Sequence, residues 1–285
     1  MRKFPALVAV DCASAHNHGV AKTPWRQRIE RAELLMRQHP SASEILSCYI
    51  PVARFQEALH EKLENMSDRQ EQTSAGQAGP PELPLLISSF PEFLSVVERH
   101  APQRLGEAAR ELHSQGEASW SQLLNNNWLS ADASPVQPAQ FLARAFLQPY
   151  AEWVRFRAAM NWQNYQDSLC PFCNRKPGVA VLRQLGEGAR RSLLCSFCLA
   201  EWDFRRIVCP ACGEKDNAKL PVYTAEEFDG IRVEACDTCK TYLKAIDLTR
   251  NGLAEPMIDE LASPSLDLWA RDHGYTKLEL NLMGL

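Results

Sequence analysis

Eight of the ten cysteines in this 285-residue chain lie between positions 170 and 239. They form four Cys-x-x-Cys pairs: Cys170/Cys173, Cys195/Cys198, Cys209/Cys212 and Cys236/Cys239. Two intervening residues allow a tight backbone turn to direct both sulfurs at one cation, and two such pairs complete a tetrahedral four-sulfur site. The spacing therefore predicts two closed metal sites.

The gaps between the pairs indicate how the pairs combine. There are 21 residues between the first and second pairs, 10 between the second and third, and 23 between the third and fourth. The long gaps match zinc-ribbon spacing, and each accommodates one β-hairpin, which favours sequential pairing. The alternative is a cross-braced arrangement that joins the first pair to the third and the second to the fourth. Sequential pairing gives one site made of Cys170, Cys173, Cys195 and Cys198, and another made of Cys209, Cys212, Cys236 and Cys239.

The first and third pairs share a local design. Each has Pro after its first Cys and is followed by a residue that tolerates left-handed backbone geometry, Asn174 or Gly213. The second and fourth pairs lack both features but precede an aromatic residue, Trp202 or Tyr242. The region therefore reads as a tandem duplication, in which we expect Trp202 to cover the sulfurs of the first site.

The chemistry of the four-sulfur sites leaves the metal open. A redox dithiol of the thioredoxin type is a single Cys-x-x-Cys at a helix start, which four copies among short strands do not fit. Tetrahedral sulfur coordination suits zinc and equally suits a single rubredoxin-type iron. The sequence Cys-Pro-Ala-Cys-Gly at 209–213 has the form of a rubredoxin knuckle, whose backbone amides donate to the sulfurs.

The apolar pattern divides the chain into four parts. Residues 1–22 lack sustained periodicity and are expected to form an irregular arm. Residues 23–168 repeat apolar residues at intervals of three and four, which predicts an all-helical domain. Short β-branched segments then alternate with the cysteine pairs, which predicts a first metal module over 169–207 and a second over 208–285. The expected fold class is multi-domain α+β, an all-α domain followed by two rubredoxin-like or zinc-ribbon-like β modules and a C-terminal helix.

Local patterns predict the length of one helix, the place of Cys48, a strand and a last helix. The longest helical pattern runs from Ala139 to about Ser168 and places Phe156 and Met160 on its buried side. Cys48 lies in an apolar helical stripe, so it reads as a small core residue. A strand is expected at Phe204–Val208 and a last helix at Ile258–His273.

Composition and charge argue against several classes of protein. A net charge of -4 gives no general attraction to nucleic acid, and residues 170–244 hold 12 Lys or Arg against 10 Asp or Glu. We expect Arg190, Arg191, Arg205 and Arg206 to face solvent rather than bind phosphates. There is no apolar run long enough for a membrane span and no Ser/His/Asp triad, phosphate loop or open three-ligand metal site.

The pattern of the N-terminal residues is not that expected of a secretory signal. Arg2 and Lys3 precede an apolar run at 4–10, but Pro5 interrupts this run and Asp11 ends it, which argues against a secretory signal. Metal-binding thiolates must also stay reduced, as they do in the cytosol.

Three segments carry a family resemblance: Leu-Cys-Ser-Phe-Cys-Leu-Ala-Glu-Trp at 194–202, Arg-Ile-Val-Cys at 206–209, and Glu-Ala-Cys-Asp-Thr-Cys-Lys-Thr-Tyr-Leu-Lys at 234–244. Together they closely resemble the formate dehydrogenase accessory protein family, FdhE. The resemblance covers residues 168–285, and the family's Cys-x-x-Cys positions match the eight cysteines one for one.

The resemblance implies a cytoplasmic, chaperone-like protein that is not an enzyme. It would bind the catalytic subunit of respiratory formate dehydrogenase before export and assist its maturation. The family's sites are described as rubredoxin-like, which favours two iron ions over two zinc ions. The alternatives left open are a rubredoxin-like electron carrier and a zinc-ribbon protein that binds nucleic acid.

Overall fold

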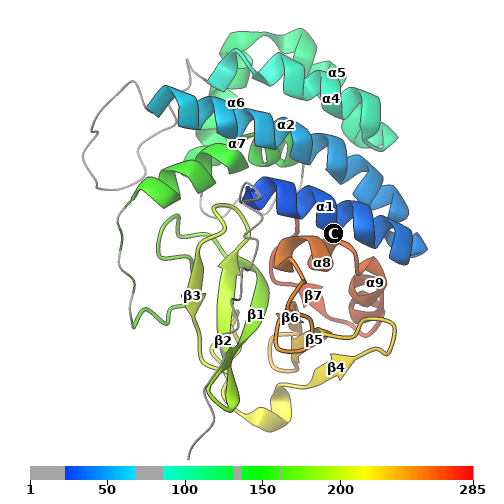
Figure 1. Ribbon diagram of the computed structural model, residues 1–285, viewed down its shortest axis with the longest axis vertical. Helices are drawn as coiled ribbons and strands as arrows, with labels where there is room; N and C mark the ends of the chain where they lie inside the picture. The colour runs from blue at the N-terminus through cyan, green and yellow to red at the C-terminus, as the bar shows by residue number, and fades with distance from the viewer. Residues whose placement is uncertain are drawn as a thin grey trace, which may run out of the picture.

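The computed structural model describes residues 23–67, 86–130, 137–158, 160, 162 and 164–284. The arm expected over residues 1–22 lies outside these residues. Within them, a group of helices lies on one side of a single β-sheet (Figure 1). None of the helices in these ranges has the length and apolar character needed to cross a membrane.

The N-terminal half is helical, as predicted. The hydroxyl of Thr23 accepts a hydrogen bond from the Arg26 N–H and caps the first helix, which opens on Pro24. Phe90 packs against Phe93, Trp120 and Phe146 at the centre of the helical core. The helices are α1 (Pro24–Gln38), the 3₁₀ turn η1 (Pro40–Ala42), α2 (Ser43–Ser67), α4 (Phe90–His100), α5 (Gln103–Gln115), α6 (Glu117–Leu129) and α7 (Pro138–Arg157).

Helix α7 is shorter than the sequence pattern predicts. It continues through Pro149 but ends at Arg157, so the helix expected to reach Ser168 is wrong beyond that point. Phe156 and Met160 are 58% and 48% exposed rather than buried. The chain after α7 instead runs toward the sheet, where Trp162 donates from its indole Nε1 to the Glu201 carbonyl over 3.2 Å. Trp162 is thus held by a partner on a distant strand rather than by a helix. The apolar periodicity of the sequence does not reveal such a contact. Cys48 is buried in the helical core, as expected.

The second half forms one seven-stranded sheet in the order β3-β2-β1-β6-β5-β4, with β7 also paired to β6. The predicted hairpins are present, because β1 pairs antiparallel with β2, and β5 with β6. The two hairpins are joined by a parallel pairing of β1 with β6, which the sequence did not predict. The strands are β1 (Pro177–Leu185), β2 (Gly188–Cys195), β3 (Glu201–Asp203), β4 (Val222–Thr224), β5 (Ile231–Cys236), β6 (Thr241–Asp247) and β7 (Thr276–Lys277).

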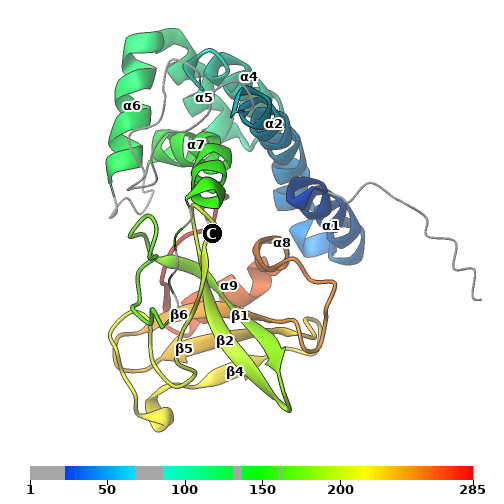
Figure 2. The same ribbon diagram turned by 60° about the vertical axis from the view of Figure 1, so that its left-hand side comes forward.

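Two local predictions in this half are wrong. Residues 204–208 do not form the expected strand. The strand in this region is β3, which ends at Asp203 and in which Trp202 pairs with Leu193 of β2. The expected C-terminal helix is two short helices, α8 (Pro256–Leu261) and α9 (Pro264–Asp272), because Pro264 begins a new helix. Figure 2 shows α8 between α1 and the sheet.

Buried ion pairs join the helical part to the rest of the chain. Arg144 of α7 lies 2.7 Å from Glu279 of the C-terminal tail and also donates to the Ser196 carbonyl over 3.1 Å. Arg31 of α1 donates to Asp259 of α8 over 2.9 Å. The tail therefore docks on the helical part, with Leu278 and Leu282 buried.

Candidate metal centre

The structure gathers the eight cysteines into two groups of four, each made of consecutive pairs. In each group the four sulfur atoms lie within 4.8 Å of one another, so each group could hold one metal ion. The first group contains Cys170, Cys173, Cys195 and Cys198, and the second contains Cys209, Cys212, Cys236 and Cys239.

The spacing of the sulfurs fits tetrahedral coordination. In the second group, Cys209 Sγ lies 3.8 Å from Cys239 Sγ, and Cys212 Sγ lies 3.7 Å from Cys236 Sγ. A metal–sulfur distance of about 2.3 Å gives a tetrahedral edge of about 3.8 Å. The corresponding distances in the first group, 3.5 Å for Cys170–Cys198 and 3.4 Å for Cys173–Cys195, are slightly shorter. Both groups therefore have the size that a single ion of this kind requires.

Each pair lies in a tight turn whose backbone polar groups are satisfied locally. In three of the turns, the N–H two residues after the first Cys donates to its sulfur over 3.4 Å: Phe172 to Cys170, Phe197 to Cys195 and Ala211 to Cys209. Such bonds stabilise a thiolate and are the kind of outer contact that tunes a bound metal.

All four turns end on a residue with left-handed backbone geometry. Asn174 (φ 58°) and Gly213 (φ 78°) were expected, but Leu199 (φ 55°) and Lys240 (φ 56°) occupy the same position after the second and fourth pairs. The second and fourth pairs therefore share the geometry without the residue type that favours it. A non-glycine residue in this region costs about 1 kcal/mol, so the geometry of the turn overrides local preference.

The two groups differ in exposure. Cys173 of the first group and Cys239 of the second are both partly exposed, whereas Cys212 of the second group is exposed and has no counterpart in the first. Burial opposes ionisation of Cys239, but hydrogen bonds from Thr241 and from neighbouring thiols lower the pKa of Cys239 to about 7. In the first group, burial likewise opposes ionisation of Cys195, and hydrogen bonds from the other three thiols hold its pKa well below the ordinary value. Each group thus contains one thiol whose pKa is lowered, while burial and the neighbouring thiols raise the pKa of Cys173 and Cys198 in the first group and of Cys209 and Cys212 in the second.

Contacts from α7 and from the metal-binding region itself fix the surroundings of the first group. Arg155 of α7 donates to the Cys198 carbonyl over 3.1 Å, and the Arg175 guanidinium lies 4.0 Å from the centre of the Phe197 ring. Trp202 is buried and donates from its indole Nε1 to the Asp167 carbonyl over 2.9 Å. The Arg155 contact thus holds the second turn of the first group against α7.

The sequence missed one pair of residues between the two groups. Arg191 was expected to face solvent, but it is 3% exposed and its guanidinium lies 2.7 Å from the Glu234 carboxylate. Arg232 also binds Glu234, with its closest nitrogen–oxygen distance at 2.6 Å. The only available signal was the period-two alternation of β2 and β5, which does not identify a partner across the sheet.

Comparison with known proteins identifies the family. The model of the FdhE central domain matches residues 169–206, and that of the FdhE C-terminal domain matches residues 207–283. An FdhE homologue from Aquifex aeolicus is 30% identical over 275 residues, which cover 90% of this chain and 94% of that protein. The chain belongs to the FdhE family. An FdhE homologue from Pseudomonas aeruginosa is 30% identical over 212 residues, 71% of this chain and 66% of that protein.

A solved structure agrees with FdhE membership at the level of the fold. The crystal structure of the FdhE protein from Pseudomonas aeruginosa superposes with a TM-score of 0.64 at 24% sequence identity. The match covers 91% of this chain and 95% of that chain, so the likeness includes the helical part, for which the sequence offered no specific motif.

Proposed function

We propose that this chain is a non-catalytic accessory protein that binds the catalytic subunit of formate dehydrogenase in the cytoplasm before the subunit is exported. The observation that carries the proposal is the match to an FdhE homologue over 94% of that protein's length. The two domain models add that the match includes both cysteine groups. An assembly role requires a surface that recognises another protein. The sheet and the helices, which buried ion pairs hold together, provide a surface of this kind.

The eight cysteines are metal ligands in this proposal, and iron is the preferred metal. Each group already supplies four sulfurs, which fills a tetrahedral coordination shell and leaves no position for a substrate. A closed site of this kind stabilises a fold rather than activating a bound molecule. The metals therefore shape the recognition surface, while the redox chemistry belongs to the dehydrogenase.

A binding experiment tests the role directly. Anaerobically purified protein is mixed with the precursor form of the catalytic subunit, and complex formation is measured by size-exclusion chromatography with light scattering. We expect a stable complex with the precursor and two iron ions per chain by elemental analysis. Absence of any complex contradicts the accessory role, and two zinc ions per chain contradict the metal assignment without affecting the role.

Electron transfer is the second candidate function, favoured by the exposure of the second cysteine group. An iron ion held there would lie next to solvent at Cys212, within reach of a redox partner. Reversible bleaching of the visible absorbance by a reductant, with reoxidation by a dehydrogenase subunit at a catalytically relevant rate, would support this function over assembly.

A further inference from the structure

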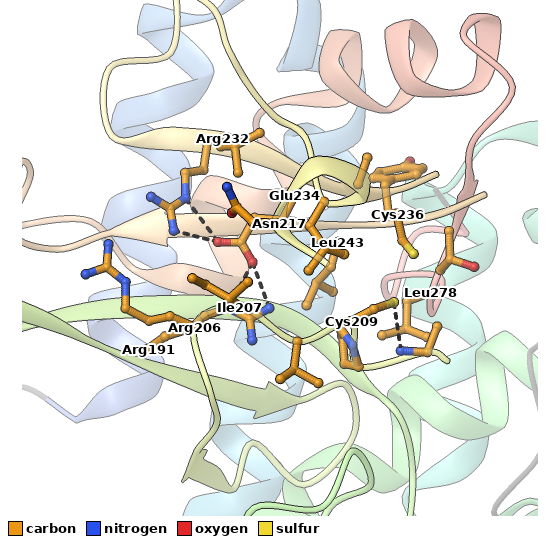
Figure 3. Close-up of a pocket in the computed structure, with 18 residues that line it drawn as sticks. Arg191, Arg206, Ile207, Cys209, Asn217, Arg232, Glu234, Cys236, Leu243 and Leu278 are labelled. Carbon is orange, nitrogen blue, oxygen red and sulfur yellow. Dashed lines mark hydrogen bonds and ion pairs between the residues drawn. The ribbon is translucent and has the colours of Figure 1, made fainter. Parts of the chain in front are cut away.

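A cavity of about 390 Å³ adjoins the second cysteine group, and we call it the second-group cavity. Alternate residues of β5, Arg232, Glu234 and Cys236, line one wall, and Cys209 belongs to the same lining. Figure 3 shows the arginines and Glu234 at one end of the cavity and the two cysteines at the other. The cavity thus connects the more exposed cysteine group to a cluster of charges.

The charged end of the cavity carries an excess of positive charge. Glu234 is the one carboxylate in the lining, and both Arg191 and Arg232 bind it. A third arginine, Arg206, also lines the cavity, is exposed, and forms no ion pair with another residue in the described part of the chain. Three guanidinium groups and one carboxylate give a formal charge of +2, which is complementary to an anionic group.

The remaining lining of the second-group cavity is mostly apolar. Leu243 and Val208 are buried within it, whereas Ile207 and Val222 are both 52% exposed. Exposed aliphatic side chains around an opening are typical of surfaces that a partner covers. The cavity therefore combines an excess of positive charge with an apolar surface.

We propose that the second-group cavity docks a short segment of the dehydrogenase catalytic subunit that carries an Asp or Glu beside apolar residues. The segment's carboxylate binds Arg206, and its apolar side chains cover Ile207 and Val222. This inference rests on the proposed function and locates the docking surface within it.

Two features favour a protein segment as the occupant. The cavity accommodates a few side chains, and Val222 belongs to β4, an outer strand that pairs only with β5 among the described strands. An outer strand is a place where an extended peptide adds to a sheet. Nucleic acid requires a row of accessible cations, but Arg191 is buried here and already bound to Glu234.

The test compares Arg206→Glu with Arg205→Glu. Both residues are exposed and the substitutions change the net charge equally, but only Arg206 lines the cavity. Binding of the catalytic subunit is measured by calorimetry, with circular dichroism and metal content as checks on folding. We expect Arg206→Glu to weaken binding at least tenfold and Arg205→Glu to change it less than twofold. A second comparison, Val222→Asp against Leu185→Asp, applies the same test to the apolar rim, since Leu185 is exposed outside the cavity.

The outcomes separate the docking site from the accessory role. If the unmodified protein binds the subunit and Arg206→Glu binds equally well, the docking site is wrong and the accessory role stands. If the unmodified protein does not bind the subunit, the accessory role fails and the docking site fails with it. Arg206-dependent binding of a single-stranded oligonucleotide, with unchanged binding of the subunit, would also overturn the docking site.

Discussion

The guanidinium of Arg191 on β2 lies 2.7 Å from the carboxylate of Glu234 on β5, although β1 and β6 separate these strands in the sheet. The two side chains therefore meet across one face of the sheet, over the strands that lie between them. Arg191 lies four residues before Cys195 of the first group, and Glu234 lies two residues before Cys236 of the second. This pair links the two metal-binding hairpins directly and forms the charged end of the second-group cavity.

Replacing Arg191 with Met should lower the free energy of unfolding by about 3 kcal/mol, because it leaves a largely buried carboxylate with one partner instead of two. Arg232→Met is the matched control, since Arg232 is more exposed and Arg191 would still neutralise Glu234. We expect the control to cost about 1 kcal/mol. Urea unfolding followed by fluorescence measures both values. Equal losses for the two variants would contradict the account of Arg191 as the link between hairpins.

The same pair predicts a pH dependence of stability. Burial opposes ionisation of Glu234, but Arg191 and Arg232 outweigh it and hold the pKa of Glu234 below its ordinary value. A folded-state pKa below the unfolded value of about 4.3 gives stability that is present above that pH and is lost as pH falls through the folded pKa. The difference in urea midpoint between the unmodified protein and Glu234→Gln should therefore be large at pH 7 and shrink below about pH 4. A difference independent of pH would show that the carboxylate charge does not contribute.

A second buried charge cluster, between β6 and the C-terminal helices, predicts a large stability loss. Lys244 is fully buried, and its Nζ donates to the Glu260 carbonyl over 2.6 Å and to Asp267 over 2.6 Å. Lys244→Met should cost about 3–5 kcal/mol because it leaves the buried carboxylates of Glu260 and Asp267 with Lys277 as their one remaining cation in this cluster of described residues. Lys240→Met is the control, since Lys240 is exposed and pairs with exposed Asp237, and it should cost less than about 1 kcal/mol. Similar thermal shifts for both variants would contradict the prediction.

Metal removal should proceed in two steps. Because Cys212 is exposed and the first group has no exposed ligand, a chelator should extract the second-group metal at least tenfold faster. Alkylation of cysteines during extraction, followed by peptide mass spectrometry, identifies which group has lost its metal. Modification of Cys212 should precede that of Cys170, which is buried. Release of both metals at one rate, or earlier modification of Cys170, would contradict the difference in exposure.

Features of the site that depend on local sequence could be predicted. The hydrogen bonds of a Cys-x-x-Cys turn join residues within the turn, as the Gly213 N–H does when it donates to the Cys209 carbonyl. The conformation of the turn therefore follows from a few neighbouring residues. The left-handed geometry of Leu199 and Lys240 could not be predicted from residue type, because the turn imposes it on residues that do not favour it.

Features of the fold that depend on contacts between distant segments could not be predicted from the sequence. The parallel pairing of β1 with β6 joins residues more than 60 positions apart, and the apolar pattern of either strand does not specify its partner. Arg191 was expected in solvent because arginine usually lies there, and only the fold supplies Glu234 as the acceptor that allows burial. The same reason applies to Arg144, whose partner Glu279 lies in the tail.

If the cysteine groups serve the assembly of formate dehydrogenase, loss of one group should abolish the activity of that enzyme in cells. The most direct measurement is formate dehydrogenase activity in cells that lack the chromosomal gene and carry either the unmodified protein or the double variant Cys195→Ser, Cys198→Ser. The amount of catalytic subunit is measured in parallel. We expect the variant to abolish dehydrogenase activity while the subunit is still synthesised at its normal level. Normal activity in cells with the double variant would contradict this role of the cysteine groups.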